Sequence, residues 1–126
     1  MRITDLLDAR SVSLTSSPKT KSEAIDQAVA LMTKSGKIND EEAYRSQVYA
    51  REEESTTGIG EGIAIPHGKC DAVSRPGLAA MVIKNGVDFD SLDGEPVTLL
   101  FLIAAPNTKD NVHLDVLSKL SVMLMD

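Results

Sequence analysis

Residues 58–68 form a glycine-rich segment that leads to the side chain with the clearest chemical potential in this sequence, His67. Three glycines alternate with other residues at the start of the segment, namely Gly58, Gly60 and Gly62. Alternating glycines let a backbone turn sharply and approach a ligand closely, while Pro66 favours an extended conformation at Ile65. We therefore expect His67 at the end of a short apolar strand, facing outward. An imidazole there can act as a nucleophile, a general base or a metal ligand.

Arg51 is a second candidate, because it lies on the inward face of a helix expected at about residues 39–54. Tyr44, Val48 and Arg51 fall at i, i+4 and i+7 of this helix. The face that docks inward therefore carries a guanidinium at its far end, close to the glycine-rich segment. Taken alone, Arg51 could instead extend to solvent or pair with a carboxylate of residues 52–54.

His113 is a third candidate, because it lies in the first turn of the last expected helix, after the apolar strand Val97–Ala105. Open α/β sheets place their sites where strands end and helices begin. The amides at that helix start favour an anion, and Arg51 offers a fork of donors to phosphate or carboxylate. A neutral His67 imidazole beside such donors could attack a phosphoryl group and hold it as phosphohistidine. Taken alone, His113 could equally be a satisfied residue near a helix cap.

The elements that must position these residues follow from hydrophobic spacing and from capping and turn signals. A short helix is expected at Ile3–Leu7, and a second helix runs from the capping box Thr20-Lys21-Ser22-Glu23 to Ser35, with Gly36 as the stop. A third helix is expected from Asn39 to about Glu54. The last helix begins at a cap at Asp110 or Asn111 and continues through Leu117, Leu120 and Leu124. Strands are expected at Val12–Leu14, before His67, and at Ala79–Ile83, Val87–Phe89 and Val97–Ala105, with turns at Asn85-Gly86 and Asp93–Pro96. The strand Val97–Ala105 is so apolar that we expect it at the centre of the sheet, with helices on both faces. The pattern predicts an α/β fold.

Composition limits the kinds of protein that this chain can be. Its 126 residues fit one domain, with 42% hydrophobic and 25% charged residues as in ordinary globular proteins. The net charge of −6 disfavours nonspecific nucleic-acid binding and suits a basic partner surface. The single Cys70 excludes an internal disulfide framework, and the sequence start lacks the apolar segment of a signal peptide, so we expect a cytoplasmic protein. No apolar run is long enough to span a bilayer, so membrane association would have to come from a partner.

Three other chemistries are weaker matches to the sequence. The glycine-rich segment lacks the Lys-Ser/Thr ending of a P-loop, which weakens a nucleotide-binding interpretation. A zinc hydrolase could use His67, Cys70, Asp71 and His113, but the His-x-x-Cys spacing has no second pair and a nearby arginine would repel a dication. Cys70 as a nucleophile lacks an orienting group beyond His67, so burial as a small apolar residue is the better expectation.

These residues carry a resemblance to a known family. The chain resembles the cytoplasmic IIA domain of the phosphoenolpyruvate-dependent sugar phosphotransferase system, of the fructose and mannitol type, over nearly its whole length. The most specific matching parts are Gly60-Glu61-Gly62-Ile63-Ala64-Ile65-Pro66-His67, the strand Val97–Ala105 with Pro106-Asn107 after it, and His113-Leu114 ahead of Leu117-Ser118-Lys119-Leu120. The opening Met1–Leu7 looks like the start of the fructose-type members.

The resemblance implies a fold, a reaction and partners. The fold would be a mixed sheet flanked by helices on both sides. His67 would accept a phosphoryl group on Nε2 from the phosphohistidine of HPr and pass it to a cysteine of a IIB domain, serving a membrane IIC domain indirectly. His113 and Arg51 would stabilise the phosphoryl oxygens, while Glu61, Gly60 and Gly62 would shape the pocket rim. No cofactor, metal or nucleic acid is implied.

The resemblance leaves two roles open, because a relative with the same motif serves nitrogen regulation and related domains occur in transcriptional regulators. The fructose-like opening favours sugar transport. We treat residues 1–126 as one IIA domain. Because the last helix shows no Gly or Pro stop at Met123–Asp126, we expect a domain shortened at its carboxyl end or the first part of a multidomain permease.

Overall fold

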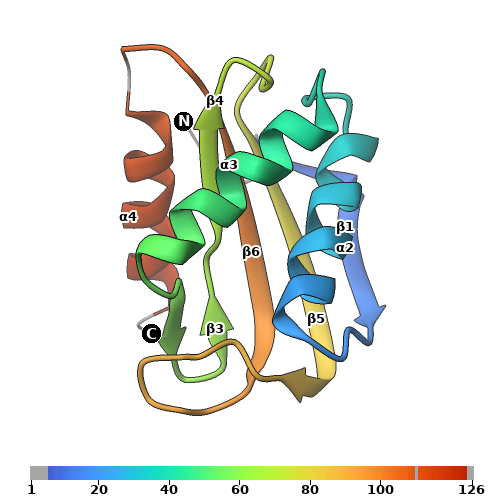
Figure 1. Ribbon diagram of the computed structural model, residues 1–126, viewed down its shortest axis with the longest axis vertical. Helices are drawn as coiled ribbons and strands as arrows, with labels where there is room; N and C mark the ends of the chain where they lie inside the picture. Colours follow the sequence, from blue (N-terminus) through green and yellow to red (C-terminus); the bar gives the residue numbers. More distant parts are fainter. Residues whose placement is uncertain (1–5, 110, 125–126) are drawn as a thin grey trace.

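A six-stranded mixed sheet forms the centre of the protein, whose computed structural model describes residues 6–109 and 111–124. Its strands are β1 (Leu7–Ser16), β2 (Gly58–Gly60), β3 (Ile63–Ala64), β4 (His67–Cys70), β5 (Gly77–Val87) and β6 (Val97–Pro106). The order is β1-β5-β6-β3-β2, with β4 also paired to β6 (Figure 1). Strand β6 runs antiparallel to β5 and parallel to β3 and β4. The prediction of a mixed sheet with this apolar strand at its centre is confirmed.

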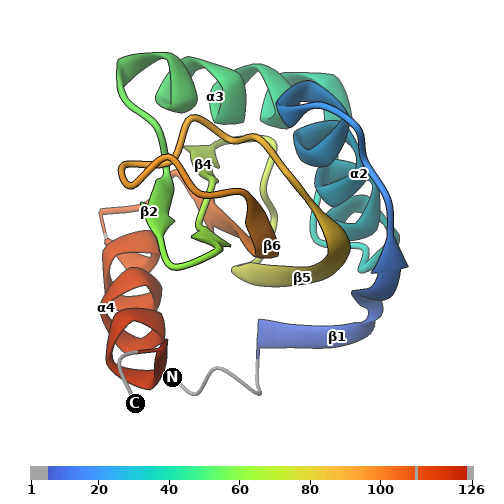
Figure 2. The same ribbon diagram turned by 90° about the horizontal axis from the view of Figure 1, so that it is seen from below.

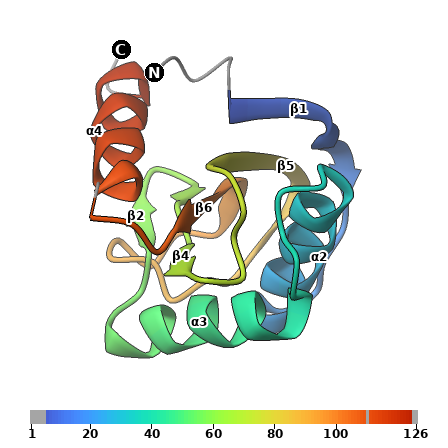
Figure 3. The ribbon, with the colours of Figure 1, turned by 90° about the horizontal axis from the view of Figure 1, so that it is seen from above.

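Helices cover both faces of the sheet, as expected. Helices α2 (Lys21–Lys34) and α3 (Glu41–Glu54) lie on one face, and α4 (Val112–Leu124) lies on the other (Figures 2 and 3). Side chains alternate along β6, so that Leu100 and Leu102 join the core under α2 and α3 while Ile103 joins the smaller core under α4. Each layer therefore has its own core, and β6 belongs to both.

The helix starts follow from capping side chains. Thr20 caps α2 by accepting from the Glu23 amide at 3.1 Å, and the Glu23 carboxylate accepts from the Lys19 amide at 2.7 Å. Gly36 follows α2 with φ of 79°, a conformation that glycine adopts without steric cost. Helix α3 is capped by Asp40 rather than by the predicted Asn39, because the Asp40 carboxylate accepts from the Ala43 amide at 3.1 Å.

Strand β5 continues through the position where a turn was predicted. The predicted turn at Asn85-Gly86 and separate strand Val87–Phe89 are wrong, since β5 extends from Gly77 to Val87 and Val87 pairs with Val97. Gly86 has φ of 74°, and the ladder shifts register between Val82 and Val87, so the glycine accommodates an irregularity within the strand. Strand β1 is likewise longer than the predicted Val12–Leu14.

Strands β3 and β4 pair with the same edge of β6 one after the other. Ile63 and Ala64 lie opposite Leu99 and Leu100, while His67–Cys70 lie opposite Ile103–Pro106. The chain leaves the ladder at Ile65-Pro66 between them, as expected where a proline removes a backbone donor. Strand β2 pairs with β3. Strand β4 contacts α3 on one face of the sheet and α4 on the other.

Two sequence predictions concern residues outside the described part of the chain. The helix at Ile3–Leu7 lies mostly there, although Leu7 itself belongs to β1, and the Asp110 cap lies there entirely. Asn111 occupies the alternative cap position, and its carbonyl accepts from the amides of Leu114 and Asp115. Among the described residues, no helix has the length and apolar character needed to cross a membrane.

Candidate functional site

A pocket of about 370 Å³ lies at the sheet edge where β4 meets α3 and α4. It is lined by Gln47, Arg51 and Glu54 of α3, by His67, Gly68 and Lys69 of β4, and by His113, Leu114 and Leu117 of α4. The structure thus brings the candidates His67, Arg51 and His113 together. Gln47 and Glu54 were missed by sequence reasoning, although with Arg51 they follow the i, i+4, i+7 spacing of one helix face.

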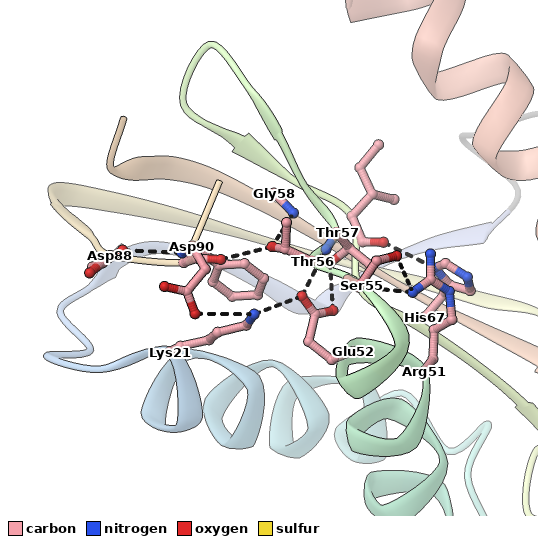
Figure 4. A network of polar contacts seen from close by, with 12 residues as sticks. Lys21, Arg51, Glu52, Ser55, Thr56, Thr57, Gly58, His67, Asp88 and Asp90 are labelled. Atoms are coloured by element: carbon pink, nitrogen blue, oxygen red, sulfur yellow. Dashed lines mark hydrogen bonds and ion pairs between the residues drawn. The ribbon is translucent and has the colours of Figure 1, made fainter. Parts of the chain in front are cut away.

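His67 is the first residue of β4, which corrects the expectation that it ends a strand. Its Nδ1 lies 3.1 Å from the Ile65 carbonyl oxygen, across the Pro66 break (Figure 4). Because a carbonyl oxygen only accepts, this contact requires a proton on Nδ1, so the neutral ring has its lone pair on Nε2. The side chain is half-buried rather than fully outward-facing. The result is an imidazole with one nitrogen fixed to the backbone and the other available for chemistry.

Arg51 reaches the same pocket from the last turn of α3. Its Nη1 donates to the Ser55 carbonyl oxygen at 3.0 Å, which holds the guanidinium beside the His67 ring (Figure 4). The neighbouring Glu52 points elsewhere and pairs with Lys21. The guanidinium therefore adds a fixed positive charge to the pocket.

His113, the second residue of α4, faces His67 from the other layer. The two ring centroids lie 6.0 Å apart and the ring planes are inclined by 26°. Its Nδ1 is buried and finds no hydrogen-bond partner among the described residues. Since buried polar atoms are normally paired, this nitrogen marks unused hydrogen-bonding capacity next to the pocket.

Both histidines have a pKa below the ordinary value of 6.5. Burial is the main cause for each ring, because it penalises the charged imidazolium. The Arg51 charge lowers the pKa of His67 further, while the charges of His67 and Lys69 lower that of His113. Both imidazoles are therefore neutral at neutral pH, which is the state of a nitrogen nucleophile.

Gly68 explains how α3 comes close enough to deliver Arg51. A Cβ at this position would lie 3.0 Å from Tyr44 Cε1 and 3.1 Å from Val48 Cγ2, which are the inward residues of α3. The Tyr44 hydroxyl also donates to the Ile103 carbonyl oxygen at 2.7 Å, so α3 is fixed to β6 behind β4. Sequence reasoning missed this role, although a glycine directly after the histidine was its signal.

The predicted pocket-shaping residues lie elsewhere. Gly60, Glu61 and Gly62 form the turn between β2 and β3, with φ of 102°, 57° and 79°. The Glu61 amide donates to Asp93 Oδ2 at 2.9 Å, and the residues lining the pocket include none of the three. The glycines serve a left-handed turn, and their proposed part in shaping the pocket stays a prediction.

The residues of the zinc alternative are not gathered. Among the residues that the structure describes, no group of three or more His, Cys, Asp or Glu side chains is placed to hold a metal ion. The Asp71 carboxylate accepts from Asn107 Nδ2 at 3.2 Å. Cys70 is half-buried and packs against the larger core, in agreement with its expected role as a small apolar residue.

Comparison with known proteins identifies the family. The model of the family "Phosphoenolpyruvate-dependent sugar phosphotransferase system, EIIA 2" matches residues 5–126. The PTS system fructose-specific EIIABC component of Bacillus subtilis is 47% identical over 125 residues, which cover 99% of this chain and 20% of that protein. The chain thus spans about a fifth of the length of this relative.

Two solved structures share the fold. The nitrogen regulatory protein IIA-Ntr from Neisseria meningitidis has a TM-score of 0.90 and 30% identity, covering 98% of this chain and 84% of that one. The enzyme IIAMTL in its complex with phosphorylated enzyme IIBMTL from Escherichia coli has a TM-score of 0.82 and 30% identity, covering 96% and 84%. The chain therefore belongs to the EIIA family of the phosphoenolpyruvate-dependent sugar phosphotransferase system, of the fructose and mannitol type.

Proposed function

We propose that this protein is a phosphocarrier that accepts a phosphoryl group on His67 Nε2 and passes it on during uptake of a fructose-type sugar. The observation that carries the proposal is the pocket in which the His67 ring, fixed through Nδ1, is flanked by Arg51 and His113. Membership of the EIIA family and the identity with a fructose-specific relative support the transport role.

The transfer needs no proton exchange at the attacking nitrogen. The Nε2 lone pair of His67 attacks phosphorus as the N–P bond of a phosphohistidine on HPr breaks, and the donor imidazole keeps the released electron pair. His67 retains its Nδ1 proton, and the Ile65 carbonyl accepts that hydrogen bond while the ring gains positive charge. In the second step a cysteine thiolate of a IIB domain attacks phosphorus, an S–P bond forms and the Nε2–P bond breaks.

Arg51 and His113 stabilise the phosphoryl oxygens in this scheme. The guanidinium supplies planar donors, and a dianion nearby favours the protonated form of His113, whose pKa is otherwise lowered by burial and by neighbouring positive charge. The donor HPr would approach the acidic surface of a chain with net charge −6, and the solved IIA–IIB complex of the mannitol relative supports a IIB acceptor. The IIC membrane domain takes part only through IIB.

Labelling from phosphoenolpyruvate tests the assignment. Incubation with phosphoenolpyruvate, enzyme I and HPr should place one phosphoryl group on the protein through an acid-labile, base-stable bond. His67→Ala should take no label, and retention of label would refute the assignment. His113→Ala should keep the fold but accept at least about tenfold more slowly or fail in onward transfer, since one stabilising donor is lost.

A regulatory module is the second candidate, in which phosphorylation of His67 only changes partner choice. The likeness to the nitrogen regulatory protein from Neisseria meningitidis favours it. Transfer of the label to the cysteine of a IIB domain separates the two, because a purely regulatory module would keep its phosphoryl group when mixed with IIB.

A further inference from the structure

We propose that Glu52 is a positioning residue for His67, acting through a chain of hydrogen bonds that ends on the imidazole. The inference rests on the proposed function, since it concerns how the same histidine is prepared to accept a phosphoryl group. The chain runs from the last turn of α3 through Thr57 and Ile65 to the ring, and Figure 4 labels Glu52, Thr57 and His67.

Glu52 is a buried carboxylate with three donors. Its side chain is 5% exposed, although it lies in the acidic run of residues 52–54. Oε1 accepts from the Thr57 amide at 2.8 Å and lies 3.0 Å from Lys21 Nζ, and Oε2 accepts from the Thr57 hydroxyl at 2.7 Å. A buried carboxylate is costly unless its oxygens are paired, and here both are.

The next link is made by backbone groups. The Thr57 carbonyl oxygen accepts from the Ile65 amide at 3.0 Å, and the Ile65 carbonyl oxygen faces His67 Nδ1 at 3.1 Å. Ile65 therefore bonds to Thr57 through its amide and to the imidazole through its carbonyl, in two successive peptide units. Because Ile65 lies in the break between β3 and β4, its backbone is held in place by the bond from its amide to the Thr57 carbonyl oxygen.

The segment before Thr57 is also held by hydrogen bonds, which restricts movement along this chain of contacts. Arg51 Nη1 donates to the Ser55 carbonyl oxygen at 3.0 Å, and the Thr56 hydroxyl donates to the Phe89 carbonyl oxygen at 2.8 Å. Arg51 and Glu52 are neighbours on α3, so one helix turn holds both the cation beside His67 and the backbone that orients it. Glu52 thus keeps the proton on Nδ1 and the lone pair on Nε2.

The test combines the state of the ring with the rate of phosphoryl acceptance. In Glu52→Ala, NMR of the ring nitrogens should show the His67 proton shared between Nδ1 and Nε2, and acceptance from phospho-HPr should slow about five- to tenfold, the worth of one hydrogen bond. Glu52→Gln can still accept from the Thr57 amide and should stay within about twofold of the original rate. Thr57→Val loses only the hydroxyl bond, so its rate of acceptance should lie between those of the two Glu52 variants. Thr57→Ser should accept at the original rate.

The matched control is Ser11→Ala. Ser11 is also fully buried, and its hydroxyl bonds to the Leu78 carbonyl oxygen at 2.9 Å between β1 and β5, away from this chain of contacts. It should lose stability without changing the ring nitrogens or the rate. Should Glu52→Ala not fold, Glu52→Gln and Thr57→Val carry the comparison.

The outcomes separate the inference from the proposed function. Ring-nitrogen signals and rates in the Glu52 and Thr57 variants that match those of Ser11→Ala would overturn the positioning role. If the unchanged protein takes no label from phospho-HPr, the proposed function fails, and the ring-nitrogen measurement still decides whether Glu52 orients His67.

Discussion

His67 and His113 lie ring against ring at the edge of the sheet, with centroids 6.0 Å apart, although one belongs to strand β4 and the other to helix α4. Two imidazolium rings at this separation repel each other, so the pair resists double protonation. Burial acts in the same direction on both rings. The electrostatic state of the pocket is therefore shared by β4 and α4.

Removing one ring should change the titration of the other. In His67→Ala, the pKa of His113 should rise toward 6.5, because the variant relieves burial and removes the His67 charge that lowers it. NMR titration of the His113 ring protons measures the shift. Lys69→Met is the control, since it removes only the weaker of the two neighbouring charges and should raise the pKa less. An unchanged His113 pKa in His67→Ala would contradict the coupling.

Stability should fall as the pH drops below about 6.5. Because the pKa of each histidine is lower in the folded protein, the unfolded chain binds more protons below that pH, so the free energy of unfolding rises with pH up to about 6.5 and then levels. Urea denaturation between about pH 5 and 7.5 measures this slope. In the double variant His67→Asn/His113→Asn, the free energy of unfolding should depend less on pH over this range. The lowered pKa of Asp93 belongs to a separate range below 3.8.

Gly68→Ala should separate α3 from β4. The added methyl group would press on Tyr44, which its hydrogen bond to Ile103 prevents from yielding, so we expect a loss of about 1–3 kcal/mol and slower phosphoryl acceptance as Arg51 moves away. Gly77→Ala is the matched control, because its Cβ would meet the side chains of Lys37 and Met32, neither of which lines the pocket. It should destabilise without slowing acceptance. Equal rate losses in both variants would show that the effect is general.

Tyr44→Phe should cost more stability than Tyr49→Phe. The Tyr44 hydroxyl is fully buried and donates to the Ile103 carbonyl oxygen, so its removal deletes a buried hydrogen bond at a cost of about 0.5–1.5 kcal/mol. The Tyr49 hydroxyl contacts Ser22 and Asp26 near the surface, and its loss should change stability by less than about 0.5 kcal/mol. Urea midpoints of the two variants give the comparison.

Much of the fold was predictable because local signals agreed with tertiary packing. The capping side chain of Thr20 and the stripe of Tyr44 and Val48 specify helices whose inward faces are the observed cores. The apolar character of Val97–Ala105 requires cover on both faces, which a central strand provides. The convergence of His67, Arg51 and His113 followed from placing these elements around that strand.

The errors arose where pairing with a distant strand decided the structure. Asn85-Gly86 has the composition of a turn, yet pairing of Val87 with Val97 continues β5 through it. His67 starts a strand of polar composition that exists because β6 offers an edge to pair with. Glu52 was considered only as one of the carboxylates that could pair with Arg51, whereas the structure buries it against Lys21 and Thr57. Each of these features depends on a contact made in the folded structure rather than on the local composition.

The pocket has one wall from each layer, α3 on the first face of the sheet and α4 on the second. A newly made chain whose first layer has assembled while the second is still detached would present His67 without its companion ring. The full set of side chains around this imidazole therefore exists only where both helix layers are docked on the sheet.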